Sequence, residues 1–142
     1  MARLQDELTR YARVLVGPDD AHDIVTNAFL RVARNGWSGV RDPRAYLYRA
    51  VSNEAHNHRR SRQRRWIRDV HAVLPPSTTP AAEHDDVRRA VEGLSVRQRA
   101  VVYLAYWRDL PEPQIAVLLG LSTSSVRRHL ERATAHLRKA LQ

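Results

Sequence analysis

The last third of the chain combines arginines with a helical repeat of apolar residues. From Ser122 onward, apolar side chains recur every three or four positions, which predicts one buried helix face. These positions are Val126, Leu130, Ala133 and Leu137. The outward positions are polar and mostly cationic: Thr123, Ser124, Arg127, Arg128, Glu131 and Arg132. Because arginine pairs bidentately with phosphates and with guanine edges, this face has the chemistry to read duplex DNA in the major groove.

A short helix is expected just before this one, separated from it by a glycine turn. Ile115 and Leu119 mark its apolar face, and Gly120 suits a helix end with positive φ. Ser122 is then a strong N-cap for the helix that follows. The short helix is expected to begin at Pro113, since a residue before proline avoids the helical region. Two short helices joined in this way form the helix-turn-helix pattern. An ordinary helical hairpin with a solvated basic face is the alternative.

A second polar stripe lies nearer the middle of the chain. Asp42 and Pro43 predict the start of a helix, with aspartate as N-cap and proline at the first helical position. The helix is expected to reach about residue 60 and to carry one continuous stripe, formed by Arg49, Asn53, Asn57 and Arg60. Asparagine is a poor helix former, so two in register indicate a role beyond helix formation. Their amides can hydrogen-bond to base edges, while the arginines can bind phosphates.

Aromatic side chains surround this stripe and admit two interpretations. The rings concerned belong to Trp37, Tyr46, Tyr48 and Trp66. They could stack on unpaired bases, as aromatic residues do in proteins that bind single strands. The alternative is that they are core residues, which is favoured for Tyr48 more than for Trp37.

The sequence gives little support for catalysis. It contains no catalytic Ser, His and Asp arrangement, no phosphate loop and no HExxH motif. His56 and His58 are two positions apart and fall on different helix faces, so they are poorly placed to chelate a metal. We therefore expect a protein that is not an enzyme and needs neither a cofactor nor a metal.

Composition favours a polyanionic partner. The chain carries 24 Lys and Arg against 15 Asp and Glu, a formal charge of +9, and a pI near 11.1. Such a balance is expected for a partner of nucleic acid or of an anionic membrane surface. The sequence has no cysteine, no apolar run long enough for a membrane span and no signal-peptide core. These features predict a soluble cytoplasmic protein without membrane insertion.

The remaining pattern predicts an all-α chain with two small helical domains. A first helix is expected to end at Gly17 and Pro18, and a second to be capped by Asp19 or Asp20. The polar side of that second helix carries Asp20, Asp23, Asn27, Arg31 and Arg34. Ser95 and Gln98 form a capping box for a later helix whose inward residues include Trp107. Residues 1–69 and 85–142 are the expected domains, and the Pro-rich segment 70–84 is the expected linker, with Asp85 as cap of the next helix.

Three blocks of the sequence resemble bacterial sigma factors of the extracytoplasmic-function (ECF) group. DDAHDIVTNAFLRVAR is similar to the family's helix that binds the β′ clamp helices of RNA polymerase. DPRAYLYRAVSNEAHNHRRSRQRR resembles the helix that melts the promoter and reads the −10 element. The stretch from Leu94 to Leu141 resembles the domain that reads the −35 element. The resemblance implies a sigma factor that binds core polymerase, through the β′ clamp helices and the β flap, and promoter DNA. An anti-sigma factor is a further partner that it implies.

The resemblance also implies three sets of site residues. The implied −35 contacts are Ser124, Ser125, Arg127, Arg128, Glu131 and Arg132. The implied −10 contacts are Trp37, Arg49, Asn53, Asn57 and Arg60, with the loop 36–41 holding a flipped-out base. The implied polymerase contacts are Asp20, Asp23, Asn27 and Arg31. The family usually has acidic residues at the position of His22 and near that of Asn27, so the affinity for β′ is expected to be lower or otherwise altered.

Two other classes of protein fit parts of the pattern. A stand-alone helix-turn-helix regulator would bind duplex DNA tightly without polymerase, as a symmetric dimer on a palindrome. A protein-interaction module would bind a polymerase subunit or an inhibitor but neither promoter element. Initiation of transcription at a defined site by core polymerase plus the purified chain separates the three.

Overall fold

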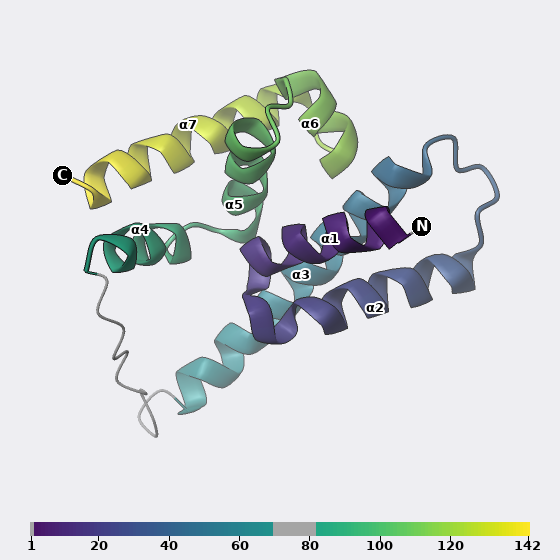
Figure 1. Cartoon of the computed structure of the whole chain (residues 1–142), viewed down its shortest axis with the longest axis horizontal. Helices are drawn as coiled ribbons and strands as arrows, with labels where there is room; N and C mark the ends of the chain where they lie inside the picture. The colour runs from purple at the N-terminus through teal and green to yellow at the C-terminus, as the bar shows by residue number, and fades with distance from the viewer. Residues whose placement is uncertain (1, 70–81) are drawn as a thin grey trace.

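The N-terminal half of the chain forms three packed helices. The computed structural model describes residues 2–69 and 82–142. The first three helices are α1 (Ala2–Val16), α2 (Pro18–Asn35) and α3 (Pro43–Asp69), and they lie side by side in Figure 1. All described elements are helical, so the expectation of an all-α fold is confirmed.

Glycine, proline and aspartate set where these helices begin and end, and the structure differs from the sequence-based expectation at two of these positions. Gly17, at φ 93°, is the N-cap of α2 and Pro18 is its first residue, so capping by Asp19 or Asp20 was wrong. Proline already has the helical φ and lacks the N–H that a cap would satisfy, so the helix begins there. The start of α3 is confirmed, since Asp42 Oδ1 accepts a hydrogen bond from the Ala45 N–H at 3.2 Å. This helix continues nine residues beyond the expected end at 60.

The C-terminal half consists of four α-helices and one π-helical turn. They are α4 (Ala82–Glu92), α5 (Val96–Val102), η1 (Tyr103–Trp107), α6 (Glu112–Leu119) and α7 (Thr123–Ala140). The capping box at the start of α5 is confirmed, because Ser95 Oγ accepts from the Gln98 N–H while the Gln98 side chain accepts from the Ser95 N–H. Helix α4 begins three residues before its expected cap Asp85, in a segment whose Ala and Glu favour helix.

Two local expectations about this half were wrong. Trp107 was expected to point inward, but it is 78% exposed. The π-helical turn has more residues per turn than an α-helix, so the 3.6-residue repeat no longer predicts the buried face there. Helix α6 begins at Glu112, one residue before Pro113. A proline within the first turn costs no helical hydrogen bond, because the first N–H groups of a helix have no partner inside it.

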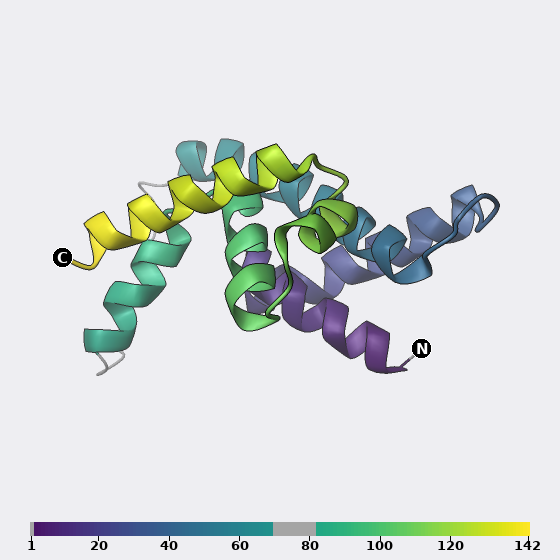
Figure 2. The same ribbon diagram turned by 90° about the horizontal axis from the view of Figure 1, so that it is seen from above.

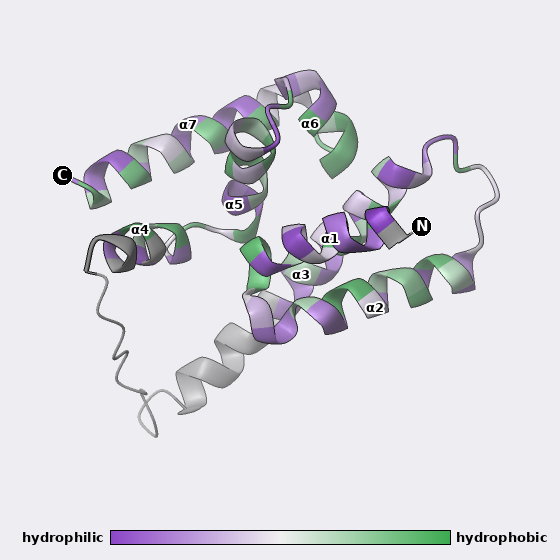
Figure 3. Cartoon of the chain, viewed as in Figure 1, coloured by the Kyte–Doolittle hydropathy of each residue, from purple (hydrophilic) through white to green (hydrophobic). Residues whose placement is uncertain are grey.

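The two halves share one hydrophobic core. Buried residues such as Leu8 and Val51 from the N-terminal half belong to the same cluster as Val101, Leu104 and Ile115 from the C-terminal half. Helix α5 lies between α7 on one side and α1 and α3 on the other (Figures 1 and 2). The apolar positions of α2 and α7 alternate with polar ones around each helix, as one-sided burial requires (Figure 3).

A buried arginine ties the core of α5 to α1. Arg99 is only 6% exposed. Its guanidinium donates to the backbone carbonyl of Leu15 at 3.1 Å, and also to those of Val91 at 2.9 Å and Glu92 at 2.6 Å. The carbonyls of Val91 and Glu92 belong to the last turn of α4, where cations are stabilising and helical partners are lacking. One side chain thus joins α1, α4 and α5.

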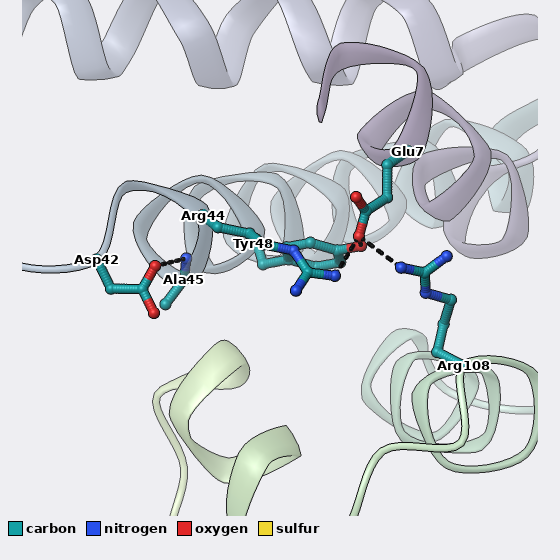
Figure 4. Close-up of polar contacts among 6 residues, drawn as sticks. All are labelled: Glu7, Asp42, Arg44, Ala45, Tyr48 and Arg108. Atoms are coloured by element: carbon teal, nitrogen blue, oxygen red, sulfur yellow. Dashed lines mark hydrogen bonds and ion pairs between the residues drawn. The ribbon is translucent and has the colours of Figure 1, made fainter. Parts of the chain in front are cut away.

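A second polar link joins α1, α3 and the residue after η1. Glu7 Oε1 accepts hydrogen bonds from Arg44, from the Tyr48 hydroxyl and, at 2.9 Å, from Arg108 (Figure 4). Partial burial alone would raise the pKa of Glu7, but the donors Tyr48, Arg44 and Arg108 outweigh it and hold the pKa below the ordinary 4.5. The carboxylate is therefore ionised at neutral pH, and its contacts reach both halves of the chain.

The lowered pKa of Glu7 predicts an acid-dependent contribution to stability. A carboxylate whose pKa is lower in the folded chain stabilises it above the unfolded pKa, near 4.5, and loses this contribution as pH falls through the folded value. Glu7→Gln is expected to lower the free energy of unfolding by about 1 kcal/mol at neutral pH, and by progressively less as the pH falls below the unfolded pKa near 4.5. Urea unfolding across this range measures the difference. The neighbouring exposed residue gives the control Asp6→Asn, and an equal pH profile for both variants would contradict the assignment.

Candidate nucleic-acid interface

Helices α6 and α7 form the expected helix-turn-helix. Gly120 ends α6 in the left-handed conformation, at φ 67° and ψ 33°. Ser122 caps α7, and its Oγ accepts from the Ser125 N–H at 3.1 Å. Val126 is fully buried and packs α7 onto the core. The structure confirms both the turn and the cap that the sequence predicts.

The outer face of α7 carries the predicted cationic side chains. The exposed residues are Ser124, Arg127, Arg128, Glu131 and Arg132, whereas Ser125 is half-buried. Arg127 Nε lies 3.0 Å from Glu112 Oε2, which links the two helices of the motif. Arg128 donates to Ser125 Oγ at 3.2 Å. These contacts hold two arginines on the exposed face without burying them, so both can still reach a ligand.

His129 does not add a positive charge to this face. Burial lowers its pKa, and the nearby cations Arg97, Arg128 and Arg132 lower it further. The imidazole is therefore neutral at pH 7, so the charge of α7 comes from its arginines and Lys139.

Helix α3 carries the predicted stripe on its exposed side. Arg49, Asn53 and Asn57 are exposed, and they lie at intervals of four residues, about one helical turn. The Asn53 amide makes no hydrogen bond among the described residues. Arg60 belongs to α3, but its side chain lies outside the described residues. The apolar side of the same helix is buried as expected, at Leu47 and Val51.

The aromatic residues near the stripe have different environments. Trp37, in the loop after α2, is 42% exposed, and its ring packs on Tyr46 with centroids 6.2 Å apart. Tyr46 precedes Arg49 by three residues, so this ring pair lies at the start of the stripe. Tyr48 is fully buried, with its ring 5.0 Å from that of Tyr11. Base stacking by Tyr48 is therefore excluded, and the core interpretation holds. The Trp66 side chain lies outside the described residues.

The polar side of α2 is partly engaged with α3. Asp23 and Asn27 are exposed. Arg31 forms an ion pair with Glu54 of α3 at 2.8 Å, and Asp20 faces His58 of α3 at 3.3 Å. The sequence did not identify Glu54 or Glu112 as partners of site arginines. The spacing of α3 is consistent with an inward-facing stem for Glu54, but it does not specify a contact with another helix.

The described part of the chain has neither a membrane-spanning helix nor a cluster of side chains suited to a metal ion. Among residues 2–69 and 82–142, no helix has the length and apolar character needed to cross a bilayer. In the same part of the chain, no cluster of three or more His, Asp or Glu side chains is arranged to hold a metal ion.

Comparison with known proteins identifies the class to which this fold and these surfaces belong. The family model for sigma-70 region 2 matches residues 1–65, and the model for sigma-70 region 4 matches residues 84–137. The RNA polymerase sigma-E factor of Streptomyces avermitilis is 33% identical over 97% of this chain and 80% of its own length. The ECF RNA polymerase sigma factor SigL of Mycobacterium tuberculosis is 31% identical over 100% of this chain and 89% of its own. The chain belongs to the sigma-70 family of RNA polymerase sigma factors, in its ECF group.

Solved structures show the same fold. CnrH, solved in complex with the cytosolic domain of CnrY, aligns with a TM-score of 0.64 and 25% identity, covering 99% of this chain and 83% of CnrH. The sigma factor RpoE from Bartonella quintana, solved in complex with the anti-sigma factor NepR, aligns with a TM-score of 0.70 and 19% identity. That alignment covers 99% of this chain and 92% of RpoE.

Family membership sets the general function. The chain is a sigma factor, which binds core RNA polymerase and promoter DNA and directs promoter-specific transcription initiation. Members of this family are non-catalytic, which agrees with the lack of catalytic motifs in the sequence.

Proposed function

We propose that this sigma factor reads duplex −35 DNA with α7 and captures the opened −10 strand with α3. The observation that carries the proposal is the exposed cationic face of α7, directly after a capped helix-turn-helix turn. The proposed −35 contacts are Ser124, Ser125, Arg127, Arg128, Glu131 and Arg132. The proposed −10 contacts are Trp37, Arg49, Asn53, Asn57 and Arg60. In this scheme the arginines bind phosphates or guanine, while the asparagines read unpaired base edges.

We propose that the two promoter elements are bound by different domains of the chain. Residues 1–69 act on polymerase and the −10 element, residues 70–84 connect, and residues 85–142 act on the −35 element. The separate matches of two family models to residues 1–65 and 84–137 support this division. Each small domain neutralises few phosphates, so each alone binds weakly and in a salt-sensitive way. Because both domains belong to one chain, binding of one element makes binding of the other intramolecular. The effective concentration of the second domain near its element is then high.

Base stacking can offset the energetic cost of strand capture by α3. Unstacking a base costs a few kcal/mol, and stacking it on an aromatic side chain returns about 1–3 kcal/mol. Trp37 is exposed enough to supply such a platform, and the Asn53 amide is available for a base edge. The domain therefore needs only to trap bases that open transiently.

The proposed polymerase surface lies on the polar side of α2. It comprises Asp20, Asp23, Asn27 and Arg31, facing the β′ clamp helices, while the C-terminal domain meets the β flap. We propose the cytoplasm as the site of action, since that is where bacterial polymerase works, and we propose no enzymatic activity for the chain itself. An anti-sigma factor is a further proposed partner, supported by two structural neighbours, one solved with an anti-sigma factor and one with the cytosolic domain of CnrY.

The direct test of this assignment is reconstituted transcription with defined templates. Core polymerase plus the purified chain is expected to start at one site on a cognate promoter and to lose activity when either element is scrambled. A stand-alone regulator would instead bind duplex DNA tightly without polymerase, and that result would contradict the proposed division between two elements.

The polymerase surface is tested by a charge reversal at Asp23. This exposed carboxylate lies on the proposed contact side of α2, so Asp23→Lys is expected to weaken core binding by about tenfold through like-charge repulsion. Co-purification with core polymerase measures the change, and duplex −35 binding by the full chain should stay the same. Asp6→Lys makes the same charge change on α1 and serves as control. Equal retention of both variants on core polymerase would remove Asp23 from the contact surface.

A further inference from the structure

A carboxylate from the first helix of the helix-turn-helix contacts one arginine of the second. Arg127 Nε donates to Glu112 Oε2 at 3.0 Å, and this is the only hydrogen bond or ion pair that Arg127 makes among the described residues. Glu131 lies four residues after Arg127 on α7, a spacing at which helical ion pairs form. Arg127 nevertheless pairs across the turn with Glu112. The contact between the two helices is therefore preferred to the local one.

The backbone on both sides of Glu112 is restricted by proline. Glu112 is the first residue of α6 and stands between Pro111 and Pro113. A proline ring fixes its own φ, which is −69° at Pro111, and it also restricts the residue before it. The Glu112 side chain is 30% exposed and the Arg127 side chain is 62% exposed. Glu112 is thus the more restrained partner, and it limits the positions open to the Arg127 guanidinium.

The atom that Glu112 binds determines which part of the guanidinium remains available to DNA. A guanidinium has five N–H groups in one plane, one on Nε and four on the two Nη atoms. Because Glu112 takes the Nε–H, the Nη1 and Nη2 end of Arg127 remains for a ligand. Guanine presents two acceptors, O6 and N7, at its major-groove edge, and the arginine fork can donate to both. The contact with Glu112 therefore leaves Arg127 suited to a guanine.

The charge of Glu112 disfavours a backbone phosphate, the other common ligand of arginine. A carboxylate beside the guanidinium repels an approaching phosphate, whereas an uncharged guanine edge is affected much less. The adjacent Arg128 differs, because it donates to the uncharged Ser125 hydroxyl at 3.2 Å. Arg128 therefore keeps its full attraction for phosphate. Two neighbouring arginines on one helix face thus have different preferred ligands.

We propose that Glu112 is a positioning residue for −35 recognition, which directs Arg127 to a guanine and away from the phosphates, while Arg128 binds a phosphate. The inference rests on the proposed reading of −35 DNA by α7. The simpler role for Glu112 is to stabilise α6, because an acidic residue in the first turn interacts favourably with the helix dipole. That role changes the stability of the chain but not its preference among bases, so base preference is the property to measure.

The test uses promoters randomised across the −35 element, transcribed by core polymerase with the full chain. The parent is expected to prefer guanine at one or more positions. Arg127→Ala is expected to reduce that preference at one position by at least about tenfold, the discrimination of one bidentate pair. Glu112→Ala is expected to reduce it about fivefold at the same position, since an exposed ion pair contributes modestly. The preferences at the other positions should stay unchanged.

Three further variants serve as controls. Asp86→Ala removes an exposed carboxylate from α4 and should leave every base preference unchanged. Glu112→Gln keeps an oxygen that can accept from Arg127 Nε, so it should retain part of the preference, and it is the second variant if Glu112→Ala folds poorly. The double variant of Glu112→Ala with Arg127→Ala should lose no more preference than Arg127→Ala alone, because Glu112 acts through Arg127.

The possible failures of the inference and of the proposed function differ in the parent. Relaxed preference at a different position, or an equal loss of activity on all templates by both Glu112 variants, would overturn the positioning role. A greater loss in the double variant than in Arg127→Ala would also overturn it, since Glu112 would then act without Arg127. In these cases a parent that prefers particular −35 bases keeps the proposed function. A parent without any −35 preference would remove the proposed −35 site together with the inference.

Discussion

Replacing Asn53 with alanine is expected to reduce promoter opening at least about tenfold while leaving closed-complex formation intact. Asn53 is exposed, and its amide makes no hydrogen bond among the described residues, so its loss removes no internal contact. Alanine is also the better helix former, so folding should be neutral or slightly improved. The variant loses only the donors and acceptor that would read an unpaired base edge.

Permanganate footprinting of −10 thymines on linear promoter DNA measures this effect. A template already melted across the −10 region should restore much of the activity, because the variant is impaired in capturing the strand and not in the later steps. Asn35→Ala, at the exposed end of α2, is the matched control. If the Asn53 variant opens the promoter as well as the parent, the −10 site lies elsewhere on the domain.

Alanine at Arg127 or at Arg132 is expected to cost about 1–3 kcal/mol of binding to a cognate −35 duplex. Both side chains are exposed on α7, the second helix of the motif. Arg127 is held by Glu112 at 3.0 Å, which limits the conformations that must be lost on binding and favours a fixed contact. Arg132 lies five residues, about one and a half turns, further along the same helix, so it should affect a different base pair or phosphate.

Comparison of cognate and scrambled duplexes distinguishes base contacts from phosphate contacts. A base contact is lost only on the cognate duplex, whereas a phosphate contact weakens both duplexes equally and lowers the salt dependence. Arg138→Ala, exposed in the last turn of the same helix, is the control for loss of charge. Full binding by both variants would show that this face of α7 does not enter the groove.

The placement of the proposed site residues on exposed helix faces was predictable to the extent that it depends on local periodicity. The outer face of α7 follows from the apolar repeat through Val126 and from the cap at Ser122, both of which act within one or two turns. The stripe on α3 follows in the same way from the spacing of Arg49, Asn53 and Asn57. The role of Tyr48 did not follow from spacing, because an aromatic residue beside a polar stripe fits either a core or a stacking surface. Its packing against Tyr11 decides for the core.

Contacts between distant segments were not predictable from spacing. Glu112 with Arg127, Glu54 with Arg31, and Glu7 with Arg108 each join different elements. Charged residues are common on exposed helix faces, so nothing in the sequence selects one pairing from many. The inward placement expected for Trp107 failed for a related reason, since the π-helical turn shifts the buried face by a fraction of a turn.

The sequence by itself determined the all-α class, the helix-turn-helix, most helix ends and the cationic character of two helix faces. Each of these properties depends on residue type and on neighbours three or four positions away, so each can be predicted from a short stretch of sequence. The tertiary structure alone decided that the two halves share one core and that α6 lies over Arg49. That arrangement depends on how the surfaces of α1, α3, α5 and α6 complement one another across long separations in the chain, and no local pattern carries that information.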